Sequence, residues 1–191
     1  NPCSEIILRP YQFCNLTEVV ARSVDTLDIL KEKVRLATIL GTFQSTLTNF
    51  KYLRKIWKDN TEEERLLGVS LTGILDCPTL NNVYYELDDV LEQLREVAVE
   101  TNKKIAKELG IQQSTAITCV KPSGTVSQLV DSASGIHARH SDYYVRTVRG
   151  DNKDPLTQFM KQSGIPFEPD VMKPDSTTVF SFPMKAPDGA I

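Results

Sequence analysis

Two cysteines and a glutamate near the amino-terminal end are the side chains in this sequence best suited to chemistry. Cys3 and Glu5 lie two positions apart in the segment NPCSE, and Cys14 follows eleven positions after Cys3. Because side chains alternate along an extended strand, this spacing puts the thiol and the carboxylate on one side. The cysteine could then act as a nucleophile or radical carrier and the glutamate as a base. Cysteine is also common as a small buried apolar residue, and spacing alone leaves both interpretations open.

A short loop with the sequence KPSGT, residues 121–125, is the second candidate. It follows a compact β-branched run at residues 115–120 and precedes another apolar segment. This pattern predicts a strand, a tight loop and the start of a helix. Backbone N–H groups, hydroxyls and the positive end of a helix dipole would then meet at a site for phosphate. A capped helix start that binds no ligand is the alternative.

The two segments together resemble a known enzyme family. Residues 1–8, NPCSEIIL, followed by FCNL at residues 13–16, are similar to the finger-loop region of ribonucleotide reductases. The short interval between the two cysteines is more similar to the adenosylcobalamin-dependent class than to the oxygen-dependent class. In that family a loop similar to KPSGT binds the substrate phosphates. Further similarity runs through residues 65–73 and 134–146, so the resemblance covers most of the chain.

The resemblance implies a role for each residue of the two segments. Cys3 would carry the thiyl radical that removes hydrogen from the ribose 3′ carbon, and Glu5 would take the proton of the 3′ hydroxyl. Asn1 would hold the ribose hydroxyls. Cys14 would be one of two thiols that reduce the substrate radical after the 2′ hydroxyl leaves as water. The substrate phosphates would be bound by Pro122, Ser123, Gly124 and Thr125.

The resemblance also implies a reaction and its partners. The protein would reduce ribonucleoside di- or triphosphates to deoxyribonucleotides, with adenosylcobalamin as cofactor and an external dithiol, such as a thioredoxin-like protein, as reductant. Residues 1–191 would form the carboxy-terminal portion of a ten-stranded α/β barrel with a catalytic finger loop. The second active-site thiol and the allosteric region would lie in an amino-terminal half outside this sequence. We therefore expect the chain alone not to turn over.

Two other classes of function fit the same residues. A nucleotide-binding module could use the loop at residues 121–125 without any radical chemistry, and Cys3 and Cys14 would then be dispensable. A structural half-barrel could instead contribute only surface to a partner chain. Neither the loop sequence nor the spacing of the cysteines distinguishes a diphosphate from a triphosphate ligand.

The bulk composition restricts the class of protein. Apolar residues make up 40% and charged residues 25% of the chain, and the net charge is −3 with both signs interspersed. This balance is typical of a globular protein and argues against direct binding to duplex DNA or an anionic membrane. No apolar stretch is long enough to span a bilayer, and the first residues do not resemble a secretion signal. We therefore expect a cytoplasmic protein.

The four cysteines and two histidines do not predict a metal site or a disulfide framework. No two cysteines form a CxxC knuckle, and His137 and His140 have no partner at zinc-site spacing. We expect no bound metal and interpret the histidines as a solvated or packed loop pair. Cys77 and Cys119, beside a predicted turn and inside a predicted strand, are interpreted as structural.

Apolar periodicity predicts the elements that must position these side chains. A capping box is expected at residues 61–64 before a short turn, and a possible interruption near Gly41 in the first long helix. The expected strands or extended segments are residues 5–8, 14–20, 66–75, 115–120, 143–148 and 177–182, and the expected helices are residues 27–49, 82–109 and 155–162. Strands separated by helices favour an α/β architecture with largely parallel strands.

Overall fold

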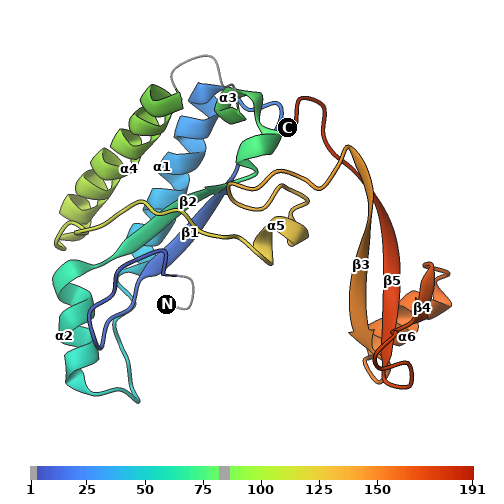
Figure 1. Ribbon diagram of the computed structural model, residues 1–191. Coiled ribbons are helices and arrows are strands. Elements are labelled where there is room, and N and C mark those ends of the chain that lie inside the picture. The colour runs from blue at the N-terminus through green and yellow to red at the C-terminus, as the bar shows by residue number, and fades with distance from the viewer. Residues whose placement is uncertain (1–3, 82–86) are drawn as a thin grey trace. The chain divides into compact units, whose positions relative to one another are not determined.

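The computed structural model describes residues 4–81 and 87–191 and shows an α/β fold (Figure 1). The chain divides into two compact units. The first contains the residues up to Arg139 together with Asp188–Ile191, and the second contains His140–Pro187. Within the described residues, no helix combines the length and apolar character needed to cross a bilayer.

The first unit is built on a small parallel sheet. Strand β1, Asn15–Val20, pairs in parallel with β2, Leu67–Thr72, so that Asn15 lies opposite Leu67. The run predicted as a strand at residues 115–120 contributes only a single parallel bridge, between Val69 and Thr118. The Val69 N–H donates to the Ile117 carbonyl at 2.8 Å, and the Val69 carbonyl accepts from the Cys119 N–H at 3.0 Å. Residues 118–119 therefore lie directly beside β2.

Two long helices cover one face of this sheet. Helix α1, Leu27–Gln44, and helix α4, Leu87–Leu109, contact each other along their length (Figure 1). Their apolar residues recur at helical spacing and pack on alternate residues of the strands. The core formed in this way includes Val19, Leu30, Val34, Leu67, Val69, Leu94 and Ala98. The residues between them on β1 and β2 therefore face away from the helices.

Several predicted boundaries in the first unit are wrong. Helix α1 ends at Gln44 and not near residue 49, and it runs through Gly41 without interruption. Residues 61–64 are not a capping box, because they form the last turn of helix α2, Lys55–Glu64, which ends at Arg65 in the left-handed conformation. Residues 5–8 form no strand. The predicted start of the second long helix, residues 82–86, lies outside the described residues.

The shorter elements of the first unit follow β2 and the loop at residues 121–125. A 3₁₀ turn at Ile74–Asp76 and helix α3, Pro78–Asn81, come after β2. Helix α5, Val126–Leu129, is a single turn that follows the loop.

The second unit is an antiparallel sheet with one helix. Strand β5, Thr177–Lys185, pairs with β3, Tyr143–Asp151, and with β4, Phe167–Pro169, and both pairings are antiparallel. The expectation of largely parallel strands is therefore wrong for this unit. Helix α6, Pro155–Gln162, confirms the prediction at both ends, because Asp154 caps it and proline occupies its first position.

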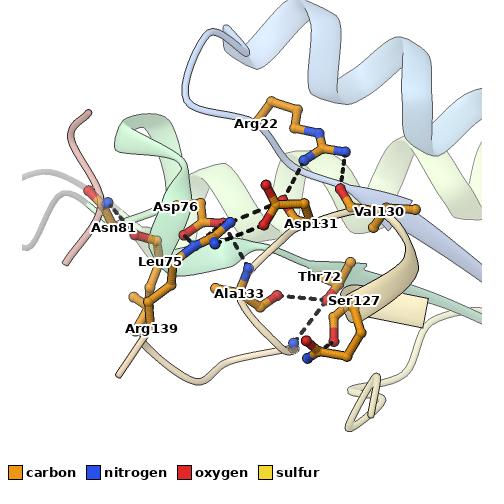
Figure 2. Close-up of polar contacts among 12 residues, drawn as sticks. Arg22, Thr72, Leu75, Asp76, Asn81, Ser127, Val130, Asp131, Ala133 and Arg139 are labelled. Atoms are coloured by element: carbon orange, nitrogen blue, oxygen red, sulfur yellow. Dashed lines mark hydrogen bonds and ion pairs between the residues drawn. The ribbon is translucent and has the colours of Figure 1, made fainter. Parts of the chain in front are cut away.

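A buried ion pair fixes the loop at residues 131–139 to the 3₁₀ turn that follows β2 (Figure 2). Arg139 Nη2 lies 2.9 Å from Asp76 Oδ2, and the two side chains are only 5% and 4% exposed. The same carboxylate accepts the backbone N–H of Ala133 at 2.7 Å. Thr72 Oγ1, at the end of β2, donates to the Ala133 carbonyl at 3.1 Å and accepts the N–H of Gly135 at 2.9 Å. Side chains therefore hold a loop that has no regular secondary structure.

We predict that Asp76→Ala strongly destabilises the first unit. The substitution leaves the Arg139 guanidinium buried without its main counter-charge, a change that typically costs about 3–5 kcal/mol. The measurement is chemical denaturation of the full-length protein, followed by a spectroscopic signal. Glu32→Ala, which breaks an exposed ion pair with Arg35, is the control and should cost less than about 1 kcal/mol. Equal losses in the two variants would contradict the structural role of Asp76.

Candidate active site

The face of the sheet that points away from the helices carries the candidate active-site residues. Val19 and Val69 lie in the helix-packed core, so residues at even positions on β1 and β2 face the opposite side. Glu18 is one of them, and Cys14, which immediately precedes β1, lies on the same side as Glu18 if the alternation continues by one residue. Gly68 lies opposite Leu16 in the register.

Glu5 lies close enough to Cys14 and Cys119 to affect the pKa of both thiols. Burial raises the pKa of the Cys14 thiol, and the negative charge of Glu5 raises it further. Burial also raises the pKa of Cys119 to about 11, with additional contributions from Glu5 and Cys14 that Lys121 partly offsets. Glu5 Oε2 is buried and has no hydrogen-bond partner among the described residues. The segment after Cys3 and the segment before the KPSGT loop therefore meet at one place.

The absent side chain of Gly68 makes this close approach possible. A Cβ atom at Gly68 would lie 2.5 Å from Leu16 Cδ2, 2.6 Å from Ile6 Cδ1 and 3.0 Å from Cys119 Sγ. Separations this short do not occur between real atoms without displacement of the neighbours. Glycine at this position therefore lets three chain segments pack together beside the thiols.

The KPSGT loop is fastened to β1 through Ser123 and Glu18. Ser123 is 1% exposed and has a φ of 51°, in the left-handed region. Its hydroxyl donates to Glu18 Oε1, and Lys121 Nζ lies 4.0 Å from Glu18 Oε2. The Ser134 hydroxyl also donates to the Ser123 carbonyl, at 2.9 Å. The loop is thus held on the same face of the sheet as Cys14.

The loop differs in two respects from the expected phosphate site. Helix α5 is only one turn long, and Thr125 at its start makes no side-chain cap, so a helix dipole contributes little here. The hydroxyl of Ser123 is directed to Glu18 and is not free for a ligand. Pro122, Gly124 and Thr125 are exposed. Any ligand would therefore meet the exposed backbone and the Thr125 hydroxyl.

The structure brings together some of the predicted site residues. Asn1 and Cys3 lie outside the described residues, whereas Glu5 and Cys14 lie close together. Cys77 is fully buried, in agreement with a structural role. Cys119 was interpreted as structural inside a strand, but it is partly exposed, outside regular secondary structure and beside Glu5 and Cys14.

Sequence reasoning also missed Glu18 and Lys121. The alternation of Cys14, Leu16 and Glu18 along one strand was the available signal for Glu18. His137 and His140 are both exposed, and the His140 ring contacts Tyr144 edge-on at 6.2 Å between centroids. Within residues 4–81 and 87–191, no group of three or more His, Cys, Asp or Glu side chains could hold a metal ion.

Comparisons with known proteins place the chain beside one group of enzymes. No family model matches. The chain is 31% identical over 189 residues to an adenosylcobalamin-dependent ribonucleoside-triphosphate reductase from Euglena gracilis, covering 97% of this chain and 25% of the relative. It is 30% identical over 212 residues to the enzyme of that name from Lactobacillus acidophilus, covering 97% of this chain and 28% of the relative. The chain therefore spans about a quarter of the length of these curated relatives.

A solved structure gives a similar result for the fold. The crystal structure of a B-12 dependent (class II) ribonucleotide reductase matches with a TM-score of 0.78 and 26% sequence identity. The match covers 99% of this chain and 29% of the other. Sequence and fold thus point to the same group of proteins.

We predict that Cys119 reacts slowly with alkylating reagents at neutral pH. A pKa raised from 9.0 to about 11 leaves roughly 100-fold less thiolate near pH 8, and the thiolate is the reactive form. The rate of iodoacetamide labelling, followed by mass spectrometry of the Cys119 peptide, should rise about tenfold per pH unit between pH 7 and 10. Labelling of the unfolded protein in denaturant is the control and should level off near pH 9. A plateau near pH 9 in the folded protein would contradict the raised pKa.

Proposed function

Because this chain is homologous over nearly its whole length to a segment of the adenosylcobalamin-dependent ribonucleotide reductases, we propose that it forms part of the catalytic site of a larger ribonucleotide reductase. The observation that carries the proposal is the meeting of two distant motifs on one face of the sheet. Glu5 and Cys14 come from the first motif. Ser123 of the KPSGT loop donates a hydrogen bond to Glu18 in β1, the strand that follows Cys14. Radical carrier, base, reducing thiol and phosphate loop would then surround one substrate.

The proposed roles follow the chemistry that each side chain can perform. Cys3, as a thiyl radical, removes the hydrogen atom from the ribose 3′ carbon, and Asn1 holds the ribose hydroxyls. Glu5 takes the proton of the 3′ hydroxyl. Its buried Oε2 atom has no hydrogen-bond partner among the described residues, which supports this role because the lone pairs of that oxygen are not already occupied by another donor.

Cys14 supplies reducing equivalents after the 2′ hydroxyl leaves as water. Its raised pKa favours the protonated thiol, which is the form that carries a hydrogen to donate. The second thiol of the reducing pair comes from the amino-terminal half of the protein. An external dithiol, such as a thioredoxin-like protein, then reduces the resulting disulfide and regenerates both thiols.

The exposed part of the KPSGT loop binds the substrate phosphates. Gly124 and Thr125 offer backbone N–H groups and a hydroxyl. Pro122 shapes the turn, and Ser123 acts by holding the loop in place. The relatives are named as ribonucleoside-triphosphate reductases, so we propose a ribonucleoside triphosphate as substrate.

The architecture of the whole protein is part of the same proposal. Residues 1–191 form the carboxy-terminal portion of a ten-stranded α/β barrel with a catalytic finger loop, and the protein is cytoplasmic. Adenosylcobalamin, when bound, would supply the radical chemistry, and Cys3 would be the residue of this chain that carries the radical. Adenosylcobalamin is proposed from the likeness to the adenosylcobalamin-dependent relatives.

We predict that ribonucleotide reduction by the full-length protein requires both Cys3 and Cys14. With CTP, adenosylcobalamin and dithiothreitol supplied, Cys3→Ser should lower deoxynucleotide formation to background because serine forms no comparable radical. Cys14→Ser should abolish multiple turnovers because the reducing thiol is lost. The control, Cys77→Ala, changes a buried cysteine in the helix-packed core and should remain active at a temperature where it is folded. Full activity of Cys3→Ser would refute the assignment, and activity without the cofactor would place the protein in another reductase class.

We predict that Glu5→Gln lowers kcat by roughly 10²–10⁴-fold, the usual contribution of a general base. The amide keeps the shape of the side chain but cannot accept the proton of the 3′ hydroxyl. Steady-state kinetics under the same conditions test this. The KM for CTP should change little, because the phosphates are bound elsewhere. A large rise in KM with unchanged kcat would show that Glu5 binds substrate and does not act as the base.

A further inference from the structure

Glu18 lies outside the segments to which the resemblance assigns roles, yet it connects them. It is part of β1, four residues after Cys14, and its carboxylate accepts a hydrogen bond from the Ser123 hydroxyl in the KPSGT loop. We propose that Glu18 is a positioning residue that holds this loop at a fixed place along β1 through the Ser123 hydroxyl. The inference rests on the proposed function in one respect, namely that the loop binds phosphate.

The environment of Glu18 indicates that its contacts with the loop are required. Its side chain is only 9% exposed, and a buried carboxylate is costly unless both oxygens find partners. Oε1 accepts the Ser123 hydroxyl, and Oε2 faces Lys121 Nζ at 4.0 Å. Both partners belong to the KPSGT loop. The carboxylate and the loop therefore stabilise each other in this arrangement.

The loop itself needs such a contact. Ser123 has a φ of 51°, a conformation that is unfavourable for a residue with a Cβ atom and persists only where surrounding contacts impose it. On one side, the Ser134 hydroxyl donates to the carbonyls of Pro122 and Ser123 at 2.8 and 2.9 Å. On the other side, Glu18 holds the Ser123 hydroxyl. Without Glu18 the Ser123 side chain would lose this hydrogen bond, while the hydroxyls of Ser134 and Ser127 would still hold the loop carbonyls.

The position of Glu18 on β1 gives this contact its functional meaning. Cys14 lies four positions before it, immediately ahead of β1, so extended chain at about 3.3 Å per residue puts roughly 13 Å between the two. A strand paired along its whole length with β2 is a rigid spacer. The hydrogen bond to Ser123 therefore sets the separation between the reducing thiol and the phosphate loop. With the phosphates bound in the loop, the reacting ribose would then lie at a fixed distance from the thiol.

The test measures binding and turnover in the full-length protein. We expect Glu18→Ala to weaken binding of CTP and of inorganic tripolyphosphate about tenfold each, measured by isothermal titration calorimetry, and to raise the KM for CTP similarly. At saturating CTP, kcat should fall less than threefold. Glu18→Gln retains an oxygen that can accept the Ser123 hydroxyl and should bind both ligands within threefold of wild type. Glu100→Ala, a change in a side chain that is 70% exposed, is the matched control and should bind as wild type.

A double-mutant cycle tests whether Glu18 acts through Ser123. Ser123→Ala alone should weaken tripolyphosphate binding to the same degree, and adding Glu18→Ala should weaken it less than twofold more. Unchanged binding in Glu18→Ala, fully additive effects, or a Glu18→Gln protein as weak as Glu18→Ala would each overturn the proposal. If Glu18→Ala does not fold, Glu18→Gln and Ser123→Ala still decide the matter.

Failure of the proposed function has a different signature. A wild-type protein that binds tripolyphosphate but reduces no ribonucleotide would refute the reductase proposal, while the binding data would still judge Glu18. A wild-type protein that binds neither tripolyphosphate nor CTP would overturn the role of Glu18 as well.

Discussion

The parallel pairing of β1 with β2 is the constraint on which the rest of the first unit depends. Its register places Leu16 opposite Gly68 and Val19 opposite Leu71, and it thereby decides which side chains meet the helices and which face the candidate site. A slip of one residue would turn Glu18 into the apolar core and expose Val19. The burial of Val19, Leu67 and Val69 under α1 and α4 therefore also fixes the chemistry of the opposite face.

Hydrogen bonds and ion pairs from side chains hold segments without regular structure against the sheet. The loop at residues 131–139 is bound to the end of β2 by Asp76 and Thr72 (Figure 2). Ser134 of the same loop supports the backbone of the KPSGT segment. Each step uses buried or partly buried hydrogen bonds, whose loss leaves unpaired polar groups and is therefore costly. Residues with no chemical role thus determine where the candidate phosphate loop lies.

Local sequence patterns predicted some parts of the structure well and others poorly. Helix α6 was predicted at both ends, and in the structure proline occupies its first position and Asp154 caps it. The run at residues 115–120 makes only one bridge, because strand formation depends on a partner that β-branched composition does not specify. In the site, the resemblance to a known family suggested Glu5 and Cys14, which lie close together in the structure, but the hydrogen bond between Glu18 and Ser123 joins positions 105 residues apart. No local pattern encodes such a contact.

Gly68 imposes a condition on how the sequence of this protein can vary. The space beside its α-carbon is already filled by Leu16, Ile6 and Cys119, which come from three separate stretches of the chain. A larger residue at position 68 becomes tolerable only if the ends of these side chains shift or the neighbours become smaller. Substitutions at the four positions are therefore expected to be interdependent, and a change that is harmful alone can be neutral in combination. Fewer combinations of residues are therefore expected at these four positions than the range accepted at each position alone would suggest.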